Sequence, residues 1–324
     1  MCSRSILLTG ATGFLGRALL QHLINTGNSS IAITTRSDQD CESLAVRKYN
    51  IPAIDGYTVW DQVFQSQIDV VVHAAARAHV MREVVLDPLF EFRQINVEGT
   101  LNLARCAAAA GVKRFIFISS IKVNGEETTL GKRYKPDDIP APLDPYGRSK
   151  MEAEAGLRAL AVETGMEVVI IRPVLIYGPG VKANFLSLMQ WLSIGIPLPL
   201  GAIRNSRSLV STDNLIDFVE TCIVHPRAAN EIFLVSDGED VSTPELLKRL
   251  ATAMGKPLRL FPVPLWLLMA VAKISRKEKM VKRVVGSLEV DISKNFDLLG
   301  WRPQVVMRDA LSKTVKSFLE LRKR

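Results

Sequence analysis

Cysteine is scarce in this sequence, and its spacing excludes two classes of protein. Cys2, Cys41, Cys106 and Cys222 form no Cys-x-x-Cys pair and no cluster with histidine. Disulfide-stabilised domains and structural zinc modules both depend on closely spaced cysteines. We therefore expect neither a disulfide framework nor a metal site.

The sequence also lacks a hydrophobic run long enough to cross a membrane. A spanning helix needs about 20 apolar residues, whereas the most apolar stretch covers residues 265–272. Three residues separate Met1 from the strand-like segment that starts at Ser5, which leaves no room for a signal peptide. We expect a cytoplasmic protein with a core helix at 265–272. Contact of this helix with a membrane surface is the alternative, because basic residues follow it.

Acidic residues are outnumbered, with 33 Asp and Glu against 41 Lys and Arg, a formal net charge of +8. Such a charge favours anionic partners. The basic residues look scattered, and no nucleic-acid-binding module accompanies them. We expect a phosphorylated small molecule as partner and no nucleic acid. The 324 residues, 48% of them hydrophobic, suffice for about two domains with packed cores.

A glycine-rich motif follows the first predicted strand. Residues 6–8 are apolar, and residues 9–16, Thr-Gly-Ala-Thr-Gly-Phe-Leu-Gly, lead into a segment with leucines at helical spacing. Glycines in this order permit a tight turn and let a pyrophosphate approach the amides of a helix N-terminus. The predicted dinucleotide contacts are Gly10, Thr12, Gly13, Phe14, Leu15 and Gly16.

The second predicted strand, residues 31–35, ends without the carboxylate that would bind an adenine ribose 2′-hydroxyl. Arg36 stands there instead, and a guanidinium can grip a 2′-phosphate. The sequence therefore favours NADP slightly over NAD. NAD remains the alternative cofactor, because Asp38 lies close by.

Further apolar segments predict the rest of a parallel sheet. The strand at 68–73 ends in Ala74, Ala75 and Ala76, whose small side chains leave room for a cofactor, and the strand at 114–118 leads to Ser119, which should face the nicotinamide. We predict an α/β fold, a Rossmann-like doubly wound parallel sheet with a smaller, partly discontinuous α/β substrate domain. Residues 1–175 with about 208–239 would bind the dinucleotide, and residues 176–207 with 240–324 the substrate.

The segment from 143 to 163 predicts a helix that carries a tyrosine and a lysine in its first turns. Asp144 is a good N-cap and Pro145 suits the first position, so Tyr146 and Lys150 should share one face. A lysine cation and the positive helix end both favour phenolate over phenol. Tyr146 is therefore predicted to have a lowered pKa and to transfer protons.

These motifs together resemble the extended short-chain dehydrogenase/reductase family, which includes NAD-dependent nucleotide-sugar epimerases and dehydratases. The resemblance covers nearly the whole chain: residues 9–16, the serines 119–120, Tyr146-x-x-x-Lys150, Arg172-Pro173 and Tyr177-Gly-Pro-Gly180 all match. It implies a catalytic triad of Ser120, Tyr146 and Lys150. It also implies cofactor contacts from Asp55, Asn96, Ser119, Tyr146, Lys150 and Pro173. The implied substrate-binding residues are Arg77, His79, Ser120, Lys122, Tyr146, Asn184, Phe185, Arg207 and Arg283.

The resemblance implies hydride transfer between a nicotinamide and the C4 carbon of a UDP-sugar. Ile121 and Lys122 replace the Asp-Glu pair that family dehydratases need, so we do not expect dehydration. Residues 76–82 and 121–126 look most like UDP-glucose 4-epimerase-like enzymes of bacteria. Some of these form UDP-N-acetylquinovosamine by reducing a UDP-4-keto-6-deoxy-N-acetylhexosamine, a step of surface polysaccharide synthesis. We rank such a reductase first and a 4-epimerase second. A non-catalytic NAD(P) sensor is the alternative of another class, and a homodimer stays open.

Overall fold

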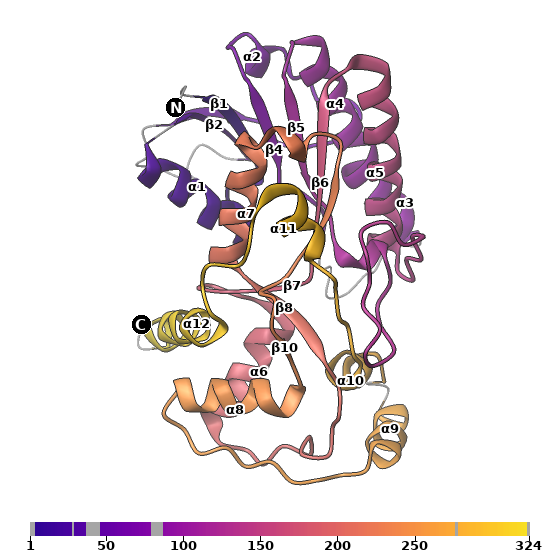
Figure 1. Ribbon diagram of the computed structural model, residues 1–324, viewed down its shortest axis with the longest axis vertical. Coiled ribbons are helices and arrows are strands. Elements are labelled where there is room, and N and C mark those ends of the chain that lie inside the picture. Colours follow the sequence, from indigo (N-terminus) through magenta and orange to yellow (C-terminus); the bar gives the residue numbers. More distant parts are fainter. Residues whose placement is uncertain (1–3, 28, 37–45, 79–86, 276–277, 323–324) are drawn as a thin grey trace.

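The computed structural model describes residues 4–27, 29–36, 46–78, 87–275 and 278–322. In this part of the chain a large parallel sheet is covered by helices on both faces, and a smaller sheet with its own helices lies at one end of it (Figure 1).

The large sheet has seven strands in the order β3-β2-β1-β4-β5-β6-β9, and every adjacent pair is parallel. The strands are β1 (Arg4–Thr9), β2 (Ser29–Thr35), β3 (Arg47–Asn50), β4 (Val70–His73), β5 (Arg114–Ile118), β6 (Glu167–Pro173) and β9 (Ile232–Val235). The strand order reverses between β1 and β4, and ligands of open α/β sheets bind beyond the carboxyl ends of the strands at such a point. The predicted α/β fold is confirmed.

Two hydrophobic clusters cover opposite faces of this sheet because side chains alternate along each strand. Ile116 and Ile118 of β5 face one cluster, whereas Phe115 and Phe117 face the other. Helices α1 (Phe14–Thr26), α7 (Thr212–Val224) and α11 (Ser293–Leu299) pack on the first face. The second face is covered by α2 (Asp61–Phe64), α4 (Thr100–Ala109) and α5 (Pro145–Thr164). This double cover explains why the strands read as continuous apolar runs.

The smaller sheet contains β10 (Asp240–Val241), β8 (Arg207–Ser211) and β7 (Leu175–Tyr177), in that order. β7 and β8 are parallel, and β8 and β10 are antiparallel. A third cluster forms its core with α6 (Ala183–Ile194), α8 (Thr243–Ala253) and α12 (Met307–Leu321) (Figure 1). The remaining helical segments are α3 (Pro88–Arg93), α9 (Leu265–Ile274), α10 (Glu278–Val285), a π-helical turn (Gln94–Gly99) and 3-10 turns at Ile121–Val123 and Pro226–Ala228.

The expectation of a core helix at residues 265–272 is wrong. These residues form most of α9, which lies at the periphery, and among them only Ala272 is buried. No helix within the described ranges is long and apolar enough to cross a bilayer.

Candidate active site

The glycine motif forms a turn between β1 and α1 that only small residues can occupy. Gly10 has a φ of +73°, and a Cβ there would lie 2.6 Å from the backbone nitrogen of Ala75. A Cβ on Gly16 would overlap the carbonyl oxygen of Gly10, to which the N–H of Gly13 donates at 2.9 Å. Backbone thus approaches backbone closely at the carboxyl ends of β1 and β4.

The N-terminus of α1 is free to receive an anion. Gly13 is its N-cap and supplies no side-chain hydrogen bond, so the amides of the first turn, which include Phe14 and Leu15, have no capping acceptor. Such amides and the helix dipole favour a pyrophosphate. Thr12 is partly exposed beside this turn, and Ala74, Ala75 and Ala76 are partly or fully exposed opposite it. These residues fit a dinucleotide.

Two further predicted cofactor residues lie near the ends of β2 and α2. Arg36 follows β2 directly and is exposed. Asp55 lies in a loop where its Oδ1 accepts hydrogen bonds from Tyr57 N (2.9 Å) and Thr58 Oγ1 (3.0 Å). Asn102 of α4 donates to the carbonyl oxygens of Asp55 and Thr58, so the loop is held against α4. Pro173 ends β6 and is buried.

Ser120 and Tyr146 meet where β5 ends and α5 begins. Asp144 caps α5 by accepting from Gly147 N at 2.7 Å, and Pro145 fills the first turn, as expected from the sequence. The Ser120 hydroxyl hydrogen-bonds Tyr146. The Tyr146 ring packs edge-on against Phe92 with ring centroids 6.1 Å apart. A proton donor and a hydrogen-bonding hydroxyl therefore share one position beyond the sheet.

The expectation that the pKa of Tyr146 is lowered is wrong for this structure. Burial, assisted by the charge of Asp144, raises the pKa of its phenol to about 12, although the Ser120 hydrogen bond opposes the shift. Lys150 does not face the phenol. Its Nζ donates to the Ile118 carbonyl at 2.8 Å and lies 4.1 Å from the Phe117 ring centroid. Burial lowers the pKa of Lys150 to about 7. Desolvation thus outweighs the Ser120 hydrogen bond at Tyr146 and the charge of Glu154 at Lys150.

Ser119 does not face the crevice, contrary to expectation. Its hydroxyl donates to Glu154 of α5, which is buried and accepts from Arg172 Nε at 3.0 Å and from Arg172 Nη2 at 2.6 Å. Arg172 Nη1 also donates to Asn124 Oδ1 at 3.0 Å. Successive side chains alternate in direction at the end of β5, so Ser119 points into the interior and Ser120 points to the side of Tyr146.

The buried ion pair was missed by the sequence analysis, although two signals announce it. Arg172 interrupts an otherwise apolar strand, and Glu154 lies one turn after Lys150 on the helix face that packs on the sheet. A buried charge requires a partner. Asn124 completes the network and, through its Nδ2, donates to the carbonyl of Lys135 at 3.0 Å. The network therefore links α5 and β6 to the chain after Ser120.

Asn96, predicted to contact the cofactor, is engaged with the chain itself. It lies in the π-helical turn between α3 and α4, a distortion that often occurs at functional sites. Its Nδ2 donates to Arg77 O (3.1 Å) and Ser149 Oγ (3.0 Å), while its Oδ1 accepts from Arg77 N (2.8 Å). Asn96 thus fixes the chain after Ala76 against α5 and positions Arg77 near Tyr146.

Lys122 lies beside the tyrosine. Its ammonium pairs with Asp144 and, at 3.7 Å, with Glu126, and it is 5.9 Å from the Tyr146 ring centroid. Ile121 is buried in the core. At these two positions, where dehydratases would need carboxylates, one side chain is inaccessible and the other is a cation.

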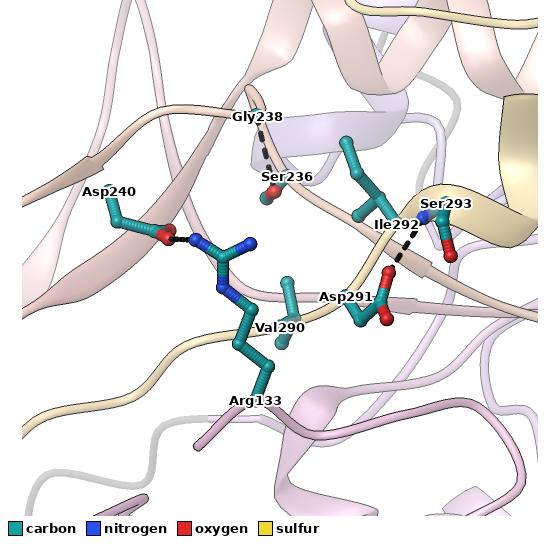
Figure 2. A pocket seen from close by; sticks show the side chains of 8 residues that line it. All are labelled: Arg133, Ser236, Gly238, Asp240, Val290, Asp291, Ile292 and Ser293. Atoms are coloured by element: carbon teal, nitrogen blue, oxygen red, sulfur yellow. Dashed lines mark hydrogen bonds and ion pairs between the residues drawn. The ribbon is translucent and has the colours of Figure 1, made fainter. Parts of the chain in front are cut away.

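A cavity of about 200 Å³ lies between the two sheets (Figure 2). Its walls come from Arg133, from Ser236 and Gly238 after β9, from Asp240, and from residues 290–293. Arg133 extends along it and pairs with Asp240 at 2.8 Å. None of the predicted triad lines this cavity, so it is separate from the predicted chemistry.

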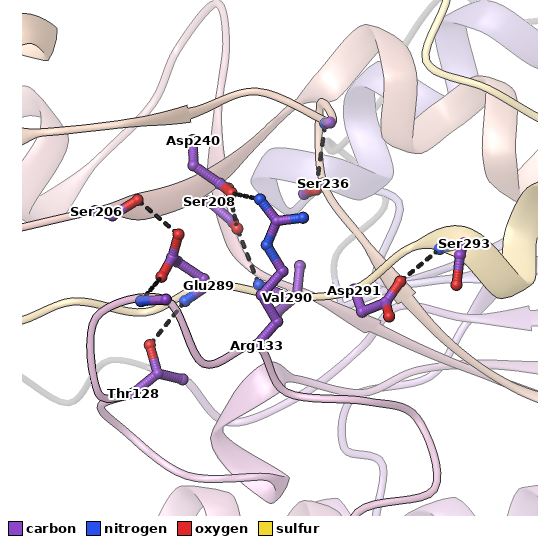
Figure 3. Close-up of polar contacts among 12 residues, drawn as sticks. Thr128, Arg133, Ser206, Ser208, Ser236, Asp240, Glu289, Val290, Asp291 and Ser293 are labelled. Carbon is purple, nitrogen blue, oxygen red and sulfur yellow. Dashed lines mark hydrogen bonds and ion pairs between the residues drawn. The ribbon is translucent and has the colours of Figure 1, made fainter.

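Loop 124–144, which follows Ser120, is joined to the smaller sheet by the contacts around this cavity (Figure 3). Buried Glu289 accepts from Gly131 N at 2.9 Å and from Ser206 Oγ at 2.8 Å. The Glu289 amide donates to Thr128 Oγ1 at 3.1 Å. These contacts hold the middle of the loop against Glu289 and the residue before β8.

The remaining predicted substrate residues are three arginines, two neighbouring residues of α6, and one histidine outside the described part of the chain. Arg207 is partly buried, and its Nη1 donates to the carbonyl oxygens of Arg283 (3.0 Å) and Gly286 (2.9 Å). Burial lowers its pKa. Arg283 itself is exposed, and Arg77 pairs with Glu91 at 3.7 Å while its buried Nε has no hydrogen-bond partner among the residues that the structure describes. These arginines remain available for anions.

The α6 end of the predicted site requires a correction. Phe185 is buried and stacks on Tyr177 with ring centroids 5.4 Å apart, so its side chain belongs to the core and offers no face to a ligand. Asn184 next to it is exposed at the start of α6. His79 lies outside the described residues.

Comparisons with known proteins agree with this geometry. Residues 6–236 match the NAD dependent epimerase/dehydratase family. The chain is 48% identical over 330 residues to a UDP-glucose 4-epimerase of Vibrio cholerae, covering 99% of this chain and 97% of the relative. Two solved structures share the fold: a UDP-glucose 4-epimerase of Thermotoga maritima with UDP-glucose (24% identity, TM-score 0.78, 98% and 99% of the two chains) and a UDP-glucuronic acid 4-epimerase of Bacillus cereus with NAD (22%, 0.79, 98% and 98%).

The family match covers more than half of the chain and includes the glycine turn, Ser120, Tyr146 and Lys150. The Vibrio cholerae relative covers nearly all of it. The chain therefore belongs to the NAD-dependent epimerase/dehydratase family, the nucleotide-sugar enzymes of the extended short-chain dehydrogenase/reductase class.

Proposed function

We propose that this enzyme is a 4-epimerase of UDP-hexoses or UDP-N-acetylhexosamines. The observation that carries the proposal is the pairing of Ser120 with Tyr146 in a chain 48% identical over nearly its full length to a UDP-glucose 4-epimerase. This similarity reverses the order expected from the sequence, in which reduction of a 4-keto sugar stood first.

Three residues of the chain would perform the proton chemistry. A dinucleotide bound at the glycine turn would supply the hydride acceptor and donor for sugar C4. Tyr146 exchanges the proton of the C4 oxygen, and Ser120 hydrogen-bonds that oxygen. A phenol pKa raised to about 12 by burial favours the protonated form, which donation to a C4 ketone requires. Accepting the proton requires phenolate, which the cationic side chain of Lys122, 5.9 Å from the ring centroid, would stabilise.

Dehydration is not proposed. Removal of water across C5 and C6 needs an acid and a base beside the sugar. Ile121 is buried and Lys122 is held by two carboxylates.

We infer that the substrate's diphosphate binds at Arg207, in a domain composed of residues 176–207 and 240–324. Arg207 is desolvated, no carboxylate forms a close ion pair with it within the described residues, and only its Nη1 has described hydrogen bonds. A guanidinium in this state gains strongly from a phosphate fork. Asn184 and Arg283 would border the same ligand.

Replacement of Arg207 by Ala should weaken UDP binding about 30-fold while uridine binding changes less than about three-fold, because only UDP brings the diphosphate. Titration calorimetry with both ligands measures this difference. Arg308→Ala, which removes an exposed arginine of α12, is the matched control and should bind UDP normally. Equal losses for UDP and uridine would mean that Arg207 acts only by holding α10.

Replacement of Lys122 by Gln should reduce turnover about three- to ten-fold near pH 7. Its cation offsets the charge of Asp144, which raises the pKa of Tyr146. Without the cation, the acidic limb of the kcat/KM profile should move to higher pH. A variant that loses turnover equally at every pH would contradict this role.

The nucleotide content and cofactor demand of the purified protein decide between epimerase and reductase. We expect NAD to be recovered from the denatured protein, and UDP-glucose to be converted without added cofactor. Arg36, exposed where family members that select NAD have a carboxylate, is the observation that favours the second candidate, an NADPH-dependent 4-ketoreductase. That candidate would instead consume one equivalent of NADPH per UDP-4-keto-6-deoxy-hexosamine, and this result would overturn the proposal.

A further inference from the structure

Helix α9 presents apolar side chains outward. Its first eight residues, Leu-Trp-Leu-Leu-Met-Ala-Val-Ala, contain no polar side chain. Trp266 is 71% exposed, Val271 57% and Ile274 85%, whereas Leu268 packs against the core of the smaller sheet. A surface helix normally turns its polar face to water. Here the outward face is hydrophobic.

The segment before α9 extends the same surface. Phe261 is 44% exposed and Leu265 50%. Pro262 and Pro264 are also exposed, and no charged residue stands between Phe261 and Lys273. A contiguous apolar surface of this kind marks an interaction site.

The positive charge of the chain is concentrated around this surface. Residues 256–283 contain eight basic residues and one acidic residue, a net charge of +7, whereas the whole chain carries +8. The impression that basic residues are scattered is therefore wrong. Lys256, Arg259, Lys273, Lys282 and Arg283 are exposed.

We propose that α9 and its basic neighbours dock the enzyme on an anionic phospholipid surface. An apolar helix face flanked by lysine and arginine fits the boundary between acyl chains and negative headgroups. The helix has 10 residues, about 15 Å in length, which is half of what a membrane crossing requires. It would lie in the interface and would not span it.

A second copy of the chain fits this surface less well. A symmetric dimer through α9 would place one +7 segment against another, and no acidic cluster in residues 256–283 would compensate the repulsion. Lipid headgroups supply the opposite charge. Charge complementarity therefore selects the membrane.

The docking surface is connected to the proposed diphosphate site. α9 packs against α10, and Arg207 donates to carbonyl oxygens at the C-terminal end of α10. Figure 1 shows α9 and α10 together at the end of the molecule remote from α2 and α4. Docking would therefore place the nucleotide-sugar end of the enzyme toward the lipid surface.

Cosedimentation of the full chain with vesicles tests the proposal. We expect binding to phosphatidylglycerol-containing vesicles, at least ten-fold weaker binding to pure phosphatidylcholine, and loss of binding at high salt. Trp266→Ser with Ile274→Ser should weaken binding at least ten-fold. Neutralising Lys256, Arg259 and Lys273 should weaken it about five-fold per residue. Neither the serine substitutions nor the charge-neutralising substitutions change a proposed catalytic residue, so turnover of a dissolved nucleotide sugar should persist.

A matched control removes equally exposed apolar side chains elsewhere. Tyr57 and Val162 are both 89% exposed and lie outside this surface, so Tyr57→Ser with Val162→Ser should bind vesicles normally. Failure of the wild-type chain to sediment with anionic vesicles would overturn the proposal. So would a concentration-dependent dimer, seen by light scattering without vesicles, that the Trp266 and Ile274 changes abolish. These results do not depend on the reaction that the enzyme catalyses.

Discussion

Replacement of Tyr146 by Phe should lower kcat about 1000-fold or more and leave NAD binding unchanged. General acid–base catalysis by a positioned side chain contributes about 10² to 10⁴ in rate, and the proposed chemistry assigns the proton of the C4 oxygen to Tyr146, beside Ser120. A Phe ring keeps the edge contact with Phe92. The fold and the glycine turn should therefore be unaffected.

Turnover of UDP-glucose in a coupled assay and calorimetric NAD binding measure the two halves of this prediction. Tyr49→Phe is the control because it removes a tyrosine hydroxyl whose partner, Ser66 at 3.1 Å, lies away from the triad. It should turn over normally. A Tyr146→Phe enzyme within ten-fold of wild type would show that another group transfers the proton.

Replacement of Glu154 by Gln should lower the free energy of unfolding by about 3–5 kcal/mol. The substitution keeps the shape of the side chain but leaves the guanidinium of Arg172, which is 2% exposed, without a carboxylate in the interior. It also removes the acceptor charge from Ser119. Loss of order should therefore reach the chain around Ser120, and turnover should fall with stability.

Urea unfolding gives the size of this effect, and the same helix supplies its control. Glu152, two residues earlier, pairs with Arg93 on the surface, where 29% and 48% of the two side chains are exposed. Glu152→Gln should cost no more than about 1 kcal/mol. In a double-variant cycle with Arg172→Met, the two changes at the buried pair should cost less together than the sum of the single changes. Strict additivity would be evidence against a coupled pair.

The sequence by itself determined the fold class, because its signals are local. The apolar run at 70–73, the glycines at 10, 13 and 16, and the Asp144-Pro145 start of α5 each depend on neighbours in the chain. Periodicity and capping act within a few residues, so such elements can be predicted from spacing alone. The strand order and its reversal between β1 and β4 became visible only in the tertiary structure.

Only the tertiary structure decided the chemical states and contacts of the side chains. Burial, which depends on residues far apart in the sequence, raises the pKa of Tyr146, lowers that of Lys150 and turns Ser119 toward Glu154. The same packing buries Phe185 and leaves Trp266 exposed, although both are large apolar residues on helices. Solvent exclusion is a property of the assembled fold, and no local spacing encodes which apolar face finds a partner.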